Sequence, residues 1–317
     1  MKGACLFFLI GCLSSSPAIF CRSEENAGVP VNSCAATDDE KSCAAKENAS
    51  EIHRELIEWM REEDAFVGEK QEVRLLNSRD PWSGYGVFAT KRIEAKEKLL
   101  SVPFDIFLHS NVEEGSEYRM PCGTIKQLLE EMDKGDESEF APYVRYLQSI
   151  ANVDILPDGW SNAGQEMLSE LLGKKLPPQD YDGFWLDEWT DDDSCDGEND
   201  PHEKEVALLV MKLMEDGYMV PYSDFFNHRN GHWTNAEIGM FKGKRLEIMS
   251  TRTIHPGEQI YTSNNMCEDC EFREKNGYGT PHMLRDYGFV EELPQRWTFQ
   301  LDRMTKVVDV AEKEDGS

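Results

Sequence analysis

The chain has 317 residues, with 33 Lys and Arg against 61 Asp and Glu, which gives a formal net charge of −28. So large an excess of acidic groups argues against a nucleic-acid backbone or an anionic membrane surface as the main partner, and it permits a basic protein or peptide. Apolar residues make up 39% of the chain, enough for one large hydrophobic core or two smaller ones. No apolar run reaches the length of about 18 residues that a membrane-spanning helix requires.

Residues 1–21 have the pattern of a secretory signal peptide. Lys2 precedes a short apolar stretch at 4–13, and small residues follow at 14–18. Charged, apolar and small-residue regions in this order predict cleavage at the end of the small-residue region or after Cys21. A buried N-terminal helix and a bacterial lipoprotein cleavage site are the alternatives. The signal peptide predicts entry into the secretory pathway, in an endomembrane lumen or outside the cell.

Residues 22–50 show no apolar periodicity and predict a flexible acidic leader. Their acidic composition disfavours a plastid transit peptide, a class that is poor in acidic residues. After removal of residues 1–21, six of the nine cysteines remain: Cys34, Cys43, Cys122, Cys195, Cys267 and Cys270. An even number suits an oxidising compartment but proves no pairing.

The folded part is expected to begin near Glu51. Apolar side chains at Ile52, Leu56 and Met60 recur at helical spacing and predict a helix over 52–66. Short runs of β type follow, and glycine or proline interrupts them. These runs are 72–76, 84–93 and 97–103.

Helical spacing returns at 124–132 and 140–151, and short β-type runs return at 220–228, 237–254 and 257–263. The Lys242–Lys244 segment predicts a hairpin turn inside the second of these runs. A β region, a helical insert at about 110–215 and a second β region predict an α+β fold.

The segment from Asp187 to Glu205 is strongly acidic, with ten acidic residues among nineteen. It lacks the glycine and the terminal glutamate that a calcium-binding loop places at fixed positions. A block of like charge is typical of a solvated surface loop, which is the interpretation we adopt. The alternative is an acidic rim that attracts a basic substrate.

Three separated segments carry residue types that suit a ligand site. The first is Gly84–Ala89, a strand entered through two glycines. The second is Pro221–His228, and the third runs from Gly257–Tyr261 to Arg285–Val290. Any one of them alone has an ordinary structural explanation. In this order and spacing they resemble the SET-domain methyltransferases, in the branch that includes Rubisco lysine and actin histidine methyltransferases, over residues 51–297.

This resemblance implies a SET domain over 51–300, with small curved β-sheets, the helical insert, and a C-terminal segment threaded into a knot-like arrangement. It also implies S-adenosyl-L-methionine as the cofactor. By the same resemblance, Gly84, Tyr85 and Gly86 form a turn whose main chain approaches the cofactor closely. Asn227 and His228 hold the amino-acid part of the cofactor.

The resemblance also places two aromatic residues in the site. Tyr287 lines the substrate channel and Phe289 packs beside the cofactor. In the family a further tyrosine follows three residues after the Gly-Glu-Gln-Ile-Tyr sequence, and here that position is Asn264. Lost activity, an altered substrate, and replacement by a neighbouring tyrosine are the competing explanations. The candidate replacements are Tyr261, Tyr222 and Tyr287, so the catalytic candidates are Tyr287, Tyr261 and Asn264.

Relatives in this branch carry a C-terminal helical domain that grips the protein substrate, and here it is expected to be absent, with a polar tail at 301–317. Cys267 and Cys270 form a CxxC pair, which is half of a zinc site; a local disulfide is favoured, and no metal is expected. The expected function is S-adenosylmethionine-dependent methylation of a lysine or histidine in a protein substrate, which is expected to be basic. The alternative is a catalytically inactive SET-like binding module.

Overall fold

The computed structural model describes residues 40–77, 84–109, 122–151, 156–157, 160–166, 186, 189–191, 195–214, 218–241, 244–264, 279–301 and 304–311. The principal elements, in chain order, are α1 (Glu40–Glu62), β1 (Phe66–Val67), β2 (Gln71–Leu75), β3 (Tyr85–Ala89), β4 (Lys98–Pro103), α2 (Cys122–Lys134), α3 (Ala141–Ile150), α6 (Pro201–Leu213), β5 (Ala236–Phe241), β6 (Arg245–Ser250), α7 (Thr280–Tyr287), β7 (Gln295–Leu301) and β8 (Met304–Val310). This order of strands, helical insert and strands confirms the predicted α+β class.

Three small antiparallel sheets make up the β part of the fold. The largest has the order β1-β4-β6-β5, and β2-β3 and β7-β8 form two-stranded sheets. In β6, Leu246, Ile248 and Ser250 are buried and alternate with half-buried neighbours, as expected for a strand with one face on the core. The β5–β6 pairing confirms the hairpin predicted around residue 243, although the tip of its turn lies outside the described residues.

Two of the predicted strands are wrong. In the 220–228 segment the chain forms a short 3-10 turn at Ser223–Phe225, and Tyr222 just before it has a φ of 73°. A left-handed residue bends the chain and breaks the extended conformation that the apolar run had suggested. The 257–263 segment forms isolated bridges instead, from Gln259 to Phe88 in β3 and from Thr262 to His228. The bridge from Gln259 to Phe88 connects the second β region to the first.

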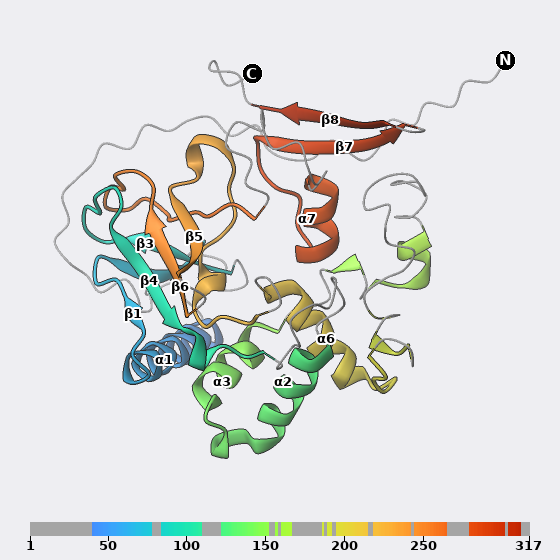
Figure 1. Ribbon diagram of the computed structural model, residues 1–317. Helices are drawn as coiled ribbons and strands as arrows, with labels where there is room; N and C mark the ends of the chain where they lie inside the picture. Colours follow the sequence, from blue (N-terminus) through green and yellow to red (C-terminus); the bar gives the residue numbers. More distant parts are fainter. Residues whose placement is uncertain are drawn as a thin grey trace.

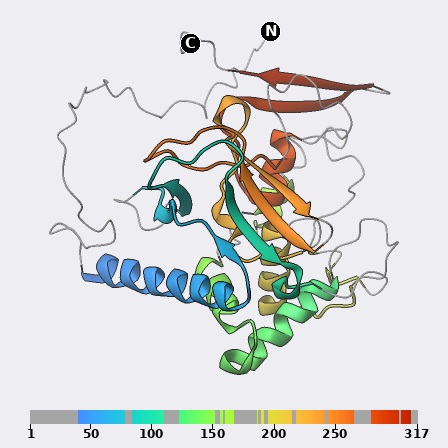
Figure 2. The same cartoon turned by 60° about the vertical axis from the view of Figure 1, so that its left-hand side comes forward.

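Helices α1, α2, α3 and α6 gather on one side of the large sheet, and the β7–β8 hairpin lies at the opposite end of the molecule (Figures 1 and 2). Leu56 and Met60 of α1 are fully buried in the core cluster, so the predicted apolar face is confirmed. The predicted start near Glu51 is wrong, because α1 begins at Glu40. Alanine, lysine and glutamate in residues 40–50 are good helix formers and extend the helix without any apolar face.

Within the described residues, no helix is both long and apolar enough to cross a membrane.

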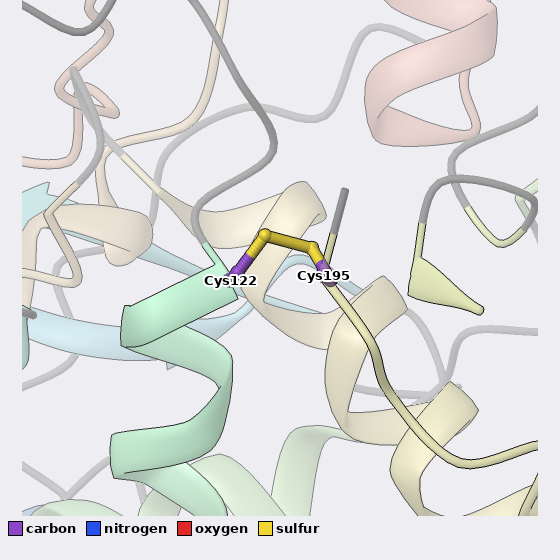
Figure 3. Close-up of a disulfide and its surroundings, with 2 residues drawn as sticks. All are labelled: Cys122 and Cys195. Carbon is purple, nitrogen blue, oxygen red and sulfur yellow. A yellow bond between two sulfur atoms is a disulfide. The ribbon is translucent and has the colours of Figure 1, made fainter. Parts of the chain in front are cut away.

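The acidic segment before α6 is anchored to the fold by two buried residues, while its described acidic side chains at 191, 196, 198 and 200 are exposed, as expected for a solvated loop. Trp189 is 1% exposed, and its main-chain oxygen accepts a hydrogen bond from Gly197 N at 2.9 Å. Cys195, also buried, forms a disulfide with Cys122 at the start of α2 (Figure 3). Asp200 caps α6 by accepting hydrogen bonds from the first turn. Two buried residues of this acidic segment, Trp189 and Cys195, fix the path of the chain.

The C-terminal part of the described chain is also more regular than expected. Residues 304–310 form β8 instead of the predicted polar tail. Arg296 faces Asp309 across the β7–β8 ladder, and their side chains pair at 2.9 Å. Val308 and Val310 are exposed, so this strand carries little of the apolar pattern by which strands are recognised.

Candidate active site

The three motifs predicted from the sequence meet at Gly86. The side-chain nitrogen Nδ2 of Asn227 donates to the main-chain oxygen of Tyr85 at 2.8 Å. A Cβ atom on Gly86 would lie 2.4 Å from Gln259 Nε2 and 2.8 Å from Asn227 Nδ2. Both separations are shorter than real Cβ contacts, so a larger residue at position 86 would force these two amides to shift. Tyr85 and Gly86 begin strand β3 and pair with β2, so they do not form the turn predicted with Gly84. Gly84 has a φ of 79°, a left-handed conformation that glycine adopts without strain.

His228, next to Asn227, is held by protein groups at both ring nitrogens. Its Nδ1 accepts a hydrogen bond from the main-chain nitrogen of Asn264 at 3.0 Å, and its Nε2 lies 2.8 Å from Glu291 Oε2. Since Nδ1 is an acceptor, the neutral ring carries its proton on Nε2 and donates it to the carboxylate. Any contact from His228 to a ligand is therefore left to its main chain, while its ring fixes the position of the loop.

Glu291 is the centre of this network, and its side chain is fully buried. Besides His228, it accepts hydrogen bonds from Asn230 Nδ2 at 2.8 Å and from Thr280 Oγ1 at 2.5 Å. Burial alone would raise the pKa of Glu291, but the hydrogen bonds from His228 and Thr280 outweigh it and hold that pKa below its ordinary value. The carboxylate thus joins the 227–230 loop to the chain around α7. Sequence reasoning assigned no role to Glu291, although it lies two residues after Phe289.

The aromatic residues predicted for the site lie beside this network. The Phe289 ring is 5.8 Å from the His228 ring and 6.1 Å from the Tyr287 ring. Tyr287 is the last residue of α7 and Phe289 follows it after Gly288, whose φ is 77°. The structure therefore brings both aromatic candidates to the loop that carries Asn227 and His228.

The three other candidate residues differ in exposure and in hydrogen bonding. Asn264 is exposed, and only its main chain contacts His228. The Tyr261 hydroxyl donates to Gln259 Oε1 at 2.8 Å, and burial raises its pKa. Tyr222 is 1% exposed and packs against Phe225 in the core. Of the tyrosines considered as replacements at position 264, Tyr222 is thus a core residue, and Tyr261 and Tyr287 lie among the motifs.

A buried polar cluster behind Tyr85 was not predicted. His53 of α1 lies with its ring 4.5 Å from the Tyr85 ring and 4.9 Å from the Phe225 ring. Burial lowers the pKa of His53 to about 4 and raises the pKa of Asp224 to about 6. Tyr146 of α3 donates to Asp224 Oδ2.

Two atoms of this cluster, His53 Nε2 and Asp224 Oδ1, are buried and have no hydrogen-bond partner among the described residues. Buried polar groups are nearly always paired in folded proteins, so such atoms suggest a ligand. His53 occupies the apolar face of its helix, where a sequence pattern does not distinguish a core histidine from a binding one.

Comparison with known proteins assigns these motifs to one protein family. The family model described as "SET domain" matches residues 84–263, which is more than half of the chain. The chain belongs to the SET-domain family. This SET-domain protein is 23% identical, over 269 residues, to an actin-histidine N-methyltransferase of Xenopus tropicalis, and the match covers 73% of this chain. It spans 44% of the length of that relative.

Solved structures support the same fold. The SET-domain protein matches the SET domain of LSMT bound to lysine and AdoHcy with a TM-score of 0.50 and 14% identity, over 84% of this chain and 68% of the other. It matches Rubisco LSMT bound to AdoMet with a TM-score of 0.51 and 14% identity, over 82% and 66%. The expected SET fold is thereby confirmed.

The sequence predicts no metal ion in the site. No group of three or more His, Cys, Asp or Glu side chains in the described ranges could hold a metal ion. The CxxC pair of Cys267 and Cys270, for which a local disulfide was predicted, lies outside those ranges.

Proposed function

We propose that this SET-domain protein is an S-adenosyl-L-methionine-dependent protein methyltransferase acting on a lysine or histidine side chain. The observation that carries the proposal is the meeting of three motifs at Gly86, where two side-chain amides lie against the first residues of β3 within contact distance of a Cβ position. The relatives support it, because an actin-histidine N-methyltransferase and the AdoMet-bound Rubisco LSMT share the family or the fold.

The residues present fit a small polar cofactor. Gln259 Nε2, beside Gly86, is a buried donor without a partner in the described chain. An acceptor group of a bound cofactor would satisfy it. The cofactor supplies an electrophilic methyl group. The chain supplies the main chain at Gly84–Gly86, where β3 begins, the amide of Asn227 and a loop fixed by the His228 ring.

Alignment of the two reactants is the main task of the remaining site residues. Methyl transfer needs the acceptor nitrogen in line with the methyl group, and holding that geometry accounts for much of the rate. The acceptor nitrogen must also be neutral, and an aromatic, poorly hydrated channel lowers the pKa of an entering lysine. Tyr287, at the end of α7, is the residue we assign to that channel, and Phe289, 6.1 Å from it, is the residue we assign to the cofactor side.

The first test measures cofactor binding and methyl transfer by the wild type and by Asn264→Tyr. Calorimetry is expected to show S-adenosylmethionine binding to both proteins with similar affinity. Transfer of labelled methyl groups to proteins of the source cell should rise about 10–100-fold in Asn264→Tyr, because a restored phenolic hydroxyl acts on the reacting centre and not on cofactor binding.

Three other outcomes of this test would support different interpretations of the protein. Folded wild-type protein that fails to bind S-adenosylmethionine would remove the methyltransferase proposal altogether. Binding without transfer by either protein would favour the inactive binding module, the interpretation that Asn264 suggests. A wild type that is already fast and is slowed by Asn264→Tyr would mean that Tyr261 or Tyr287 has taken the role.

We also propose that the protein substrate is basic and that nucleic acid is not the substrate. The support is the net charge of −28, which attracts basic segments and repels a phosphate backbone. The acidic residues near the anchored Cys195 lie in the helical insert.

Finally, we propose that the mature protein begins near residue 19 or 22 and enters the secretory pathway. The signal-like pattern of residues 1–21 supports this start. The Cys122–Cys195 disulfide supports an oxidising compartment. N-terminal sequencing of protein purified from its own cells should show the cleaved start. An intact Met1 together with free thiols throughout would place the protein in the cytosol.

A further inference from the structure

The side-chain amide of Gln259 occupies the point where the motifs meet, and its two ends have different surroundings. Oε1 accepts the hydrogen bond of the Tyr261 hydroxyl at 2.8 Å. Nε2, at the other end, is buried and has no hydrogen-bond partner among the residues that the structure describes. A buried donor without an acceptor lowers stability unless something else accepts its protons. Gln259 belongs to the third sequence motif, but the motif alone assigns it no role.

The orientation of this amide follows from its neighbours. The Tyr261 hydroxyl holds the oxygen end, so the nitrogen end is directed to the opposite side. There it lies against Gly86, 2.4 Å from the position of a Cβ atom on that residue. Asn227 Nδ2 lies 2.8 Å from the same position and already donates to Tyr85 O. Two amide donors therefore lie against the start of β3, and the Nε2 donor of Gln259 has no acceptor among the described residues.

Resting on the function proposed above, we propose that Gln259 is a further cofactor-binding residue. Its Nε2 donates a hydrogen bond to an oxygen of the cofactor, a carboxylate or a hydroxyl, bound beside Gly86. Tyr261 is its positioning residue, since its hydroxyl fixes which end of the amide faces the ligand. This assignment accounts for the buried donor and for the contact between Tyr261 and Gln259.

The test replaces the donor and keeps the acceptor. In Gln259→Glu, one carboxylate oxygen still accepts from Tyr261, and the other takes the place of Nε2. Calorimetry with S-adenosylhomocysteine should show the dissociation constant rising about 5–150-fold, the range expected when one buried hydrogen bond is lost. Thermal unfolding of the free protein should change little, because the introduced oxygen can accept from the nearby Asn227 amide. Gln165→Glu, in the helical insert, is the matched control and should bind like the wild type.

A second measurement needs no substitution and so covers a variant that fails to fold. In the wild-type protein, the side-chain amide protons of Gln259 should shift downfield and exchange more slowly with solvent when S-adenosylhomocysteine is added. Two results would overturn the role of Gln259 and leave the proposed function intact. One is that the Gln259 side-chain amide resonances do not change when the ligand is added. The other is a folded Gln259→Glu protein whose affinity for the ligand equals that of the wild type. A wild type that binds no ligand would overturn both.

Discussion

Replacing Glu291 with alanine is expected to lower the free energy of unfolding by about 3–5 kcal/mol. The substitution removes a fully buried carboxylate and leaves His228 Nε2 and Thr280 Oγ1 without their acceptor, while Asn230 Nδ2 keeps its hydrogen bond to Pro294 O at 3.1 Å. Each buried donor left unpaired costs about 1–3 kcal/mol, and losses at groups in contact are not additive. Chemical denaturation followed by fluorescence measures the change.

The neighbouring glutamate provides a matched control. Glu292 pairs with Arg229 at 2.7 Å, but its side chain is 72% exposed, so Glu292→Gln should cost no more than about 1 kcal/mol. Equal losses from Glu291→Ala and Glu292→Gln would contradict the role assigned to the buried network. The isosteric Glu291→Gln should fall between them, because it keeps one acceptor oxygen but places an amide donor among donors.

The same carboxylate predicts a dependence on pH. The pKa of Glu291 is held below its ordinary value in the folded protein, so its stabilising effect is fully present above the ordinary glutamate pKa. The effect is lost as the pH falls through the lowered value. The difference in stability between wild type and Glu291→Gln should therefore be constant near neutral pH and shrink below about pH 4. A difference that grew in acid would contradict the direction of the shift.

Loss of the Cys122–Cys195 disulfide is expected to lower the free energy of unfolding by about 2–4 kcal/mol. The bond joins residues 73 apart in sequence, and a cross-link that closes a loop of this length restricts the unfolded chain strongly. The double substitution Cys122→Ala/Cys195→Ala should show this loss in denaturant unfolding. The helical insert should be the part that loosens first, because the bond connects α2 to the segment before α6.

Reduction of the wild-type protein gives an independent comparison. A reductant should lower the stability of the wild type to that of the double variant and should have no effect on the double variant itself. Mass spectrometry after thiol labelling shows whether the bond is open. If the wild type keeps its stability once both thiols are labelled, the disulfide does not stabilise the fold.

The sequence predicted those features that rest on local patterns or on motif order. The apolar spacing of Ile52, Leu56 and Met60 predicted the buried face of α1, and the turn residues at 242–244 predicted the β5–β6 hairpin. The sequence-based prediction was wrong where the residue composition indicated one local structure and the folded chain adopts another. Residues 40–50 have no apolar face and were assigned to a leader, yet their helix propensity continues α1. Residues 304–310 were assigned to a tail, yet pairing with β7 makes them a strand.

By itself, then, the sequence determined the family, the α+β class and the motif residues, such as Gly86 and Asn227, that the fold brings together. These follow from motif order and from the chemistry of single side chains. Only the tertiary structure decided which partners those side chains have. Gln259, Glu291 and Cys195 gain their roles from residues at least tens of positions away or from an orientation that a pattern does not record. Hydrogen-bond satisfaction in a buried site depends on distances between segments, and a linear sequence contains no such distances.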